Sequence, residues 1–155
     1  DHGLDQVLEV DADGASSIWL GPHVSPNGTA FTADGDALWI ATTYATVQPV
    51  WRVPVQEGAA GAPQVVTEFG SGDVGDGVAL GASGALYVAQ NIGGRVDRVD
   101  PDGTVTTISS EAAWAASLAF GEGVGWDRCS VYVTSLFSGD VFRVEVGEVG
   151  QPPLR

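Results

Sequence analysis

Short stretches of apolar and β-branched residues alternate with turn-forming residues along most of the chain. Residues 29–32 precede Asp34-Gly35, and an apolar run over residues 37–41 follows that turn. The same order occurs at residues 78–80, where Ser83-Gly84 separates one apolar run from the next. Apolar stretches of this length on both sides of Asp-Gly or Ser-Gly turns are typical of β-hairpins. The pattern therefore predicts an all-β fold built from successive hairpins.

Two motifs repeat along the chain at a regular spacing. The first is a strand that ends in Glu-Val or Arg-Val, and its charged residue recurs after 43, 46 and 45 positions, at Glu9, Arg52, Arg98 and Arg143. The second is an apolar pair that opens a strand of small residues, and it recurs after 48 and 45 positions, at Leu38, Leu86 and Val131. A period of about 40–50 residues made of short strands is the length of one four-stranded β-propeller blade.

The repeat divides residues 1–155 into the blades of a partial β-propeller. We expect blade material at about 5–45, 46–91 and 92–135, followed by a final outer hairpin over 137–155. About three blades do not close a ring, since closed propellers have about four to eight. An open ring leaves unpaired strand edges. The repeat therefore predicts that either a missing N-terminal half or a second copy of the chain completes the propeller.

The charge of the chain narrows the classes of partner. There are 20 acidic residues and six basic ones, all six of them arginine, so the formal net charge is −14. A surface of this charge repels phosphate backbones, and we expect no nucleic-acid partner. No apolar run reaches the roughly 18 residues of a membrane helix, so no membrane partner is expected either. Acidic loops suit a hard cation such as calcium, although solubility alone also accounts for an acidic surface.

The chain has a single cysteine, Cys129. It is either a buried thiol or one half of a disulfide to a segment outside this sequence. The absence of lysine and this unpaired cysteine favour an extracytoplasmic or secreted location over a cytoplasmic one.

Three polar residues stand at matching places when the inner hairpins are aligned by their turns. Asn27 precedes Asp34 by seven residues, and Asp76 precedes Ser83 by the same interval. Ser117 stands seven residues before Val124, next to Gly125. Each position is the entry to the innermost strand of a blade, and such entries converge on one face of the central channel. The oxygens of Asn and Asp are hard ligands suited to Ca²⁺ or Mg²⁺.

A simpler interpretation exists for two of these residues. Asn27-Gly28 and Asp76-Gly77 are common turn dipeptides, and Asp34-Gly35 is a turn of this kind. Each hairpin already has its turn seven residues further on, however, so a second turn at Asn27 or Asp76 is not needed. The register therefore favours a metal or ligand role.

The same segments resemble a known family. Residues 25–41, which read Ser-Pro-Asn-Gly-Thr-Ala-Phe-Thr-Ala-Asp-Gly-Asp-Ala-Leu-Trp-Ile-Ala, are similar to the Pro-Asn-Gly strand motif of the senescence-marker-protein/gluconolactonase/regucalcin family. Residues 75–80 with 84–89, and residues 117–121 with 131–135, resemble the motifs of its later blades. The resemblance implies a six-bladed propeller, of which this chain holds about three four-stranded blades. It also implies a divalent cation, calcium foremost, with Asn27 and Asp76 as ligands and a further Glu ligand upstream of residue 1.

The activity implied by the resemblance is metal-dependent hydrolysis of a lactone or related ester. Asp76 would bind the ion and act on a water molecule, and Asn27 would be a second ligand. Substrate contacts are expected at Ser117, His23 and Trp114; a strand-entry hydroxyl and an exposed loop histidine are the simpler interpretations of the first two. The alternative function is a non-catalytic propeller that binds a ligand or a protein, since the fold hosts both.

Overall fold

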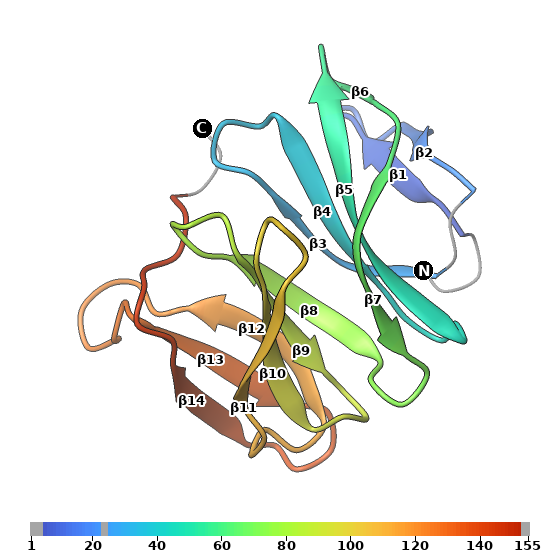
Figure 1. Ribbon diagram of the computed structural model, residues 1–155. Helices are drawn as coiled ribbons and strands as arrows, with labels where there is room; N and C mark the ends of the chain where they lie inside the picture. The colour runs from blue at the N-terminus through green and yellow to red at the C-terminus, as the bar shows by residue number, and fades with distance from the viewer. Residues whose placement is uncertain (1–4, 23–24, 153–155) are drawn as a thin grey trace.

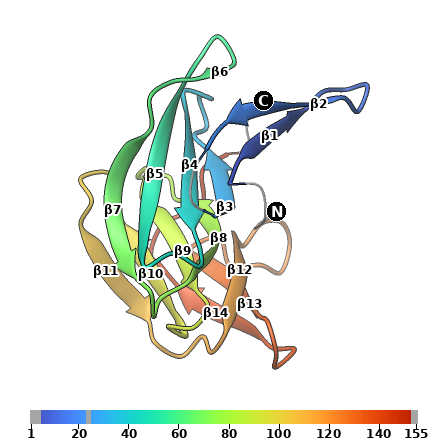
Figure 2. The same ribbon diagram turned by 90° about the vertical axis from the view of Figure 1, so that its right-hand side faces the viewer.

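A computed structural model describes residues 5–22 and 25–152, which form antiparallel β-sheets and contain no helix (Figures 1 and 2). The strands are β1 (Val7–Val10), β2 (Ser16–Leu20), β3 (Pro26–Phe31), β4 (Ala37–Thr42), β5 (Val47–Gln56), β6 (Ala59–Ala60), β7 (Gln64–Gly70), β8 (Gly75–Leu80), β9 (Leu86–Gln90), β10 (Arg95–Val99), β11 (Val105–Ser109), β12 (Ala115–Phe120), β13 (Ser130–Ser135) and β14 (Val141–Glu145). The described residues thus include no helix of the length and apolarity that crossing a membrane requires.

The strands are grouped into three successive blades and one separate hairpin. The first blade has the order β3-β4-β5-β7, with the short β6 paired to the end of β5. The second has the order β8-β9-β10-β11, the third has β12-β13-β14, and β1 pairs only with β2. The innermost strands lie side by side, with β8 in contact with both β3 and β12. This succession of small antiparallel sheets is the arrangement of propeller blades, and it confirms the predicted all-β propeller fold.

The sheets correct the blade segments expected from the sequence. Each of the segments 5–45, 46–91 and 92–135 joins the two outer strands of one sheet to the two inner strands of the next. The cause is the Arg-Val motif, which falls on β5, β10 and β14, the third strand of each blade rather than the first. Over 137–155, the described residues contain the strand β14 but no hairpin partner after it.

The core consists of apolar layers between neighbouring sheets. All residues of β4 and β9 are buried. Successive side chains of a strand point to opposite faces of its sheet, and each face of these sheets packs against a different neighbour. Leu38 and Ile40 pack against the β1–β2 hairpin, while Trp39 and Ala41 pack against the second blade. Tyr87, one repeat further along, is fully buried between the second and third blades. The aromatic residues of the repeat thus fill the spaces between blades, as expected for core residues.

After β14 the chain returns across the end of the blades that carries the β3–β4 and β8–β9 turns. We call residues 146–152 the C-terminal strap. The backbone N–H of Ala82 donates to the carbonyl of Val149 at 2.8 Å, and the N–H of Gln151 donates to the carbonyl of Leu80 at 2.9 Å. The side-chain oxygen of Gln151 also accepts the N–H of Ala33, at 2.8 Å. The strap therefore links the third blade to both the second and the first.

A partly buried carboxylate fastens the strap to the second blade. Glu148 accepts hydrogen bonds from the Tyr87 hydroxyl at 2.8 Å, the Arg98 guanidinium at 2.6 Å and the Ser83 N–H at 2.8 Å. Burial alone would raise the pKa of Glu148, but these donors together hold it below its ordinary value. Burial and the hydrogen bond to Glu148 raise the pKa of Tyr87 to about 12. The ionised carboxylate and the protonated phenol are thus the forms that the fold stabilises.

Exchange of Glu148 for glutamine is expected to destabilise the fold by about 1–2 kcal/mol at neutral pH, because the charged hydrogen bonds are lost. In the wild type this contribution is complete above pH 4.5, the ordinary pKa of Glu148, and is lost as the pH falls through the lower pKa of the folded state. The contribution of Tyr87 is complete below pH 10 and disappears between pH 10 and about 12. Urea unfolding across this range measures both effects. Glu122→Gln is the control, since Glu122 is exposed, and an equal effect of the two substitutions would contradict the role of Glu148.

Candidate functional site

The three innermost strands begin with the same irregularity. In β3 the pairing with β4 shifts between Pro26 and Thr29, so that Asn27-Gly28 carries one extra residue. In β8 the equivalent shift lies between Gly75 and Val78, around Asp76-Gly77. A third shift lies between Ala115 and Ser117 in β12. Bulges of this kind redirect side chains and are common beside active sites.

The residue before each innermost strand has a left-handed backbone. These residues are not glycine, and their φ angles are 41° at Ser25, 57° at Val74 and 55° at Trp114. Positive φ costs a non-glycine residue about 1–3 kcal/mol and persists only where its surroundings enforce it. Here the carbonyl of each residue accepts a backbone N–H from the loop after the second strand, and the donors are Thr43, Asn91 and Leu136, at 3.0, 2.8 and 2.9 Å. The same anchored turn thus sets the direction of the bulge in every blade.

Asn27 and Asp76 occupy equivalent places in adjacent blades. Both lie inside strands, so the interpretation of Asn27-Gly28 and Asp76-Gly77 as turns is wrong. The glycines have another purpose, since a Cβ added at Gly28 would lie 2.1 Å from the carbonyl oxygen of Asp76. Only glycine allows the two innermost strands to approach this closely. The structure therefore brings the Asn27 and Asp76 segments together at the same end of the channel.

Ser117 does not share this register. A Cβ added at Gly77 would lie 2.6 Å from the Cα of Ser117, so Ser117 corresponds to Gly77 and Gly28. The residue that corresponds to Asn27 and Asp76 is Ala116, which has no oxygen in its side chain. The alignment by turns was wrong because the loop over residues 121–129, between β12 and β13, is longer than the other two inner turns. Ser117 remains exposed at the entry of β12, where its N–H donates to the hydroxyl of Thr134 at 3.2 Å.

Thr43 is a residue of this site that the sequence did not reveal. Its hydroxyl donates to the carbonyl of Gly75, and it lies 3.4 Å from the side-chain nitrogen of Asn27. An Asn27 whose amide nitrogen faces Thr43 keeps its carbonyl oxygen for another partner. Asn91 is the equivalent in the second blade, because its amide donates to the carbonyl of Ala115 at 3.2 Å. The signal in the sequence is a polar residue directly after the apolar second strand of the first two blades, and these two residues are 48 positions apart.

The donors present suit a hard cation in part. Asn27 and Asp76 offer amide and carboxylate oxygens, which calcium prefers, but calcium takes about six to eight oxygen ligands. Among residues 5–22 and 25–152, no three His, Cys, Asp or Glu side chains are gathered as a metal-binding group. Asp76 has an interaction partner within the protein.

The remaining residues singled out in the sequence are Trp114, His23 and Cys129. Trp114 precedes β12, is 44% exposed and contacts the ring of Phe137 edge-on, with centroids 5.1 Å apart. His23 lies outside the described residues. Cys129 is a half-buried free thiol within the part of the chain that the structure describes.

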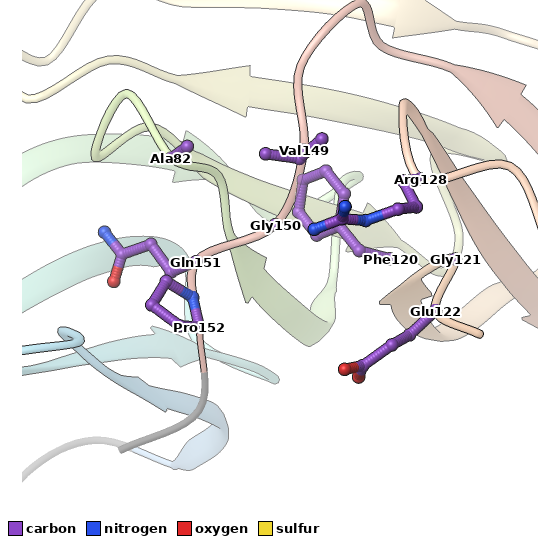
Figure 3. A pocket seen from close by; sticks show the side chains of 9 residues that line it. All are labelled: Ala82, Phe120, Gly121, Glu122, Arg128, Val149, Gly150, Gln151 and Pro152. Atoms are coloured by element: carbon purple, nitrogen blue, oxygen red, sulfur yellow. The ribbon is translucent and has the colours of Figure 1, made fainter. Parts of the chain in front are cut away.

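A cavity of about 470 Å³ lies at the opposite end of the blades, beneath the C-terminal strap (Figure 3). Its wall includes Phe120, Arg128 and Val149. The cavity is not lined by Asn27, Asp76, Ser117 or Trp114, so it is separate from the Asn27–Asp76 site.

Comparison with known proteins agrees with the fold. The successive antiparallel sheets and their repeated strand entries define a β-propeller. The chain belongs to the family described as SMP-30/Gluconolactonase/LRE-like region, whose model matches residues 1–137. A 6-deoxy-6-sulfogluconolactonase from Pseudomonas putida is 35% identical over 139 residues, covering 87% of this chain and 46% of the relative.

Solved structures extend the likeness of the fold. A putative gluconolactonase superposes with a TM-score of 0.75 at 23% identity, covering 96% of this chain and 48% of that one. A calcium-binding protein, regucalcin, from Agrobacterium tumefaciens has a TM-score of 0.74 at 21% identity, covering 97% of this chain and 54% of the other. This chain therefore spans about half the length of the relatives that it matches.

Proposed function

We propose that the chain is part of a lactonase-like hydrolase that cleaves a small lactone or ester and uses a divalent cation, calcium foremost. The observation that carries the proposal is the pair Asn27 and Asp76, presented by identical bulges on adjacent innermost strands. The 35% identity to a sulfogluconolactonase supports the reaction class. The donor oxygens of the pair support the choice of a hard cation.

The residues of this chain take distinct roles in the proposal. Asp76 accepts the proton of an attacking water molecule and orients it, while Asn27 directs its carbonyl oxygen to the same place because Thr43 holds its amide nitrogen. A cation bound there would polarise the substrate carbonyl. Trp114 and Ser117, at the entry of β12, contact the substrate from the third blade, and His23 is a further candidate contact.

We infer that additional blade material, rather than a second copy of this chain, completes the ring. The third blade has its first three strands within the described residues, and the β1–β2 hairpin corresponds to the third and fourth strands of another blade. If two copies formed a ring, β14 of one copy and β1 of the other would both have to occupy the third-strand position of the same blade. The coverage of relatives by about half of their length supports the same inference.

Calcium is expected to raise the melting temperature of the native assembly, meaning the chain together with the blades that complete it. At a concentration about a hundredfold above the Kd, binding stabilises a protein by about 2.7 kcal/mol, which corresponds to about 5–10 °C. Calorimetry with calcium and with a chelator measures the shift. Asp76→Asn should abolish it, and Glu111→Gln, which also removes one carboxylate charge, should leave it unchanged.

Two results would contradict the proposal. A melting temperature that is identical with calcium and with chelator would refute the cation site. No turnover of any lactone by the cation-loaded assembly would instead support the alternative, a propeller that only binds.

A further inference from the structure

The loops between the second and third strands carry exposed apolar side chains at the same position in every blade. Each of these residues follows the loop residue whose N–H anchors the strained turn, and they are Tyr44, Ile92 and Phe137. Their exposed fractions are 70%, 56% and 70%. Single exposed apolar residues are normal, but the same exposure repeated at one structural position in three blades is not explained by chance placement on the surface.

Trp114 is a fourth exposed apolar residue beside these loops, and we call Tyr44, Ile92, Trp114 and Phe137 the apolar rim. The ring of Trp114 contacts that of Phe137. The amide of Asn91, next to Ile92, reaches the carbonyl of Trp114 at 3.5 Å. The loop of the second blade that carries Ile92 is thus hydrogen-bonded to the third-blade residue Trp114, which itself contacts Phe137.

The apolar rim borders the Asn27–Asp76 site. Thr43, the chain neighbour of Tyr44, contacts both the Asn27 amide and the carbonyl of Gly75, which precedes Asp76. In Figure 1 the β4–β5, β9–β10 and β13–β14 loops lie at the same end of the blades, away from the C-terminal strap. A molecule whose reacting group is at Asn27 and Asp76 therefore extends its remaining part over the rim.

The charges near the rim exclude one kind of substituent. In residues 5–22 and 25–152, the arginine next to the rim loops is Arg95, and its guanidinium is already paired with Asp73 at 2.7 Å and with Asp97 at 2.8 Å. Arg128, which forms no ion pair with the other described residues, lines the cavity at the opposite end. Among the described residues, the rim loops therefore offer apolar contact and no unpaired arginine for an anionic substituent.

We propose that the substrate is a neutral lactone whose ring carries an alkyl or aryl substituent, and that the apolar rim binds this substituent. The inference rests on the proposed hydrolase function and defines its substrate class. Water adds to the lactone carbonyl, the ring C–O bond breaks, and the product is a hydroxy acid that releases one proton. The substrate class differs from the sulfonated sugar lactone for which the Pseudomonas putida relative is named.

The test compares lactones that share a ring and differ in the tail. The native assembly loaded with calcium is assayed with δ-valerolactone, with δ-decanolactone and with glucono-δ-lactone. The expected result is a kcat/KM at least about tenfold higher for δ-decanolactone than for either of the others, because burial of a few methylenes has an effect of this size. Equal values, or a preference for glucono-δ-lactone, overturn the substrate class and leave the hydrolase proposal intact. Absence of turnover for all three overturns the hydrolase proposal itself.

A pair of variants connects the preference with the rim. Phe137→Ser is expected to lower the δ-decanolactone to δ-valerolactone ratio of kcat/KM about fivefold to tenfold. Val124→Ser is the control, because Val124 is a fully exposed apolar residue in the β12–β13 loop at the other end of the blades. An unchanged ratio in Phe137→Ser overturns the proposal. The same holds if the substitution changes only the sedimentation of the assembly, since the rim would then be a protein contact. Melting temperatures of both variants verify that the fold is retained.

Discussion

Asp76→Asn is expected to slow lactone hydrolysis by the native assembly by about a hundredfold to ten-thousandfold. Asparagine keeps the shape of the side chain but removes the negative charge and the capacity to take a proton from water. The strand entry should be preserved, because the bulge depends on Gly77 and on the anchored turn at Val74 rather than on the carboxylate. Initial rates with δ-valerolactone, at a calcium concentration that saturates the wild type, measure the effect.

The control for this experiment is Glu111→Gln, which alters an exposed carboxylate next to the third blade. Its rate should match that of the wild type. A variant Asp76→Asn that retains more than a tenth of the wild-type rate would remove Asp76 from the chemistry, while a large fall in melting temperature without calcium would indicate a structural role instead.

Gly28→Ala is expected to destabilise the protein by about 2–3 kcal/mol, a typical cost of forcing extra volume into a close-packed contact. The added Cβ would lie 2.1 Å from the carbonyl oxygen of Asp76 and 3.0 Å from the backbone nitrogen of Val78. Backbone atoms cannot move aside as a flexible side chain would, so the first and second blades must separate locally. The substitution should therefore reduce both stability and calcium binding, although it changes neither candidate ligand.

Gly72→Ala provides the matched comparison, because an added Cβ there meets nothing within 4 Å. We expect it to change the free energy of unfolding by less than about 0.5 kcal/mol. Urea unfolding of the two variants measures the difference. Equal stabilities would show that the innermost strands do not approach as closely as described.

The repeat was readable from the sequence because each blade needs the same residues at the same places. Trp39 and Tyr87 fill equivalent spaces between sheets, and Arg52 and Arg98 lie on equivalent third strands. Periodicity reveals the spacing of such residues but not which strand of a blade they occupy. For that reason the repeat predicted the propeller, while the blade boundaries were displaced by two strands.

The candidate site was predicted only as far as local register allowed. Asn27 and Asp76 were found because equal spacing to a short turn places them alike. Ser117 was displaced by one residue because the loop over 121–129 is longer than the corresponding turns of the other blades. The strained turns gave no signal at all, since Val74 and Trp114 are not residues that favour positive φ. Thr43 recurs as Asn91 in the repeat, but its hydrogen bond to Gly75 crosses a blade boundary, and the repeat does not show which residue of the next blade it contacts.

The C-terminal strap has a consequence for how the blades unfold. Repeated units that contact only their neighbours can open one at a time from an end. Here the hydrogen bond between Gln151 and Ala33 joins the first blade to the segment that follows the third, and bypasses the blade between them. The third blade therefore cannot unfold without breaking the strap's hydrogen bonds to the second and the first blades. The three blades should therefore unfold as a single cooperative unit, without the stepwise loss expected of a simple array.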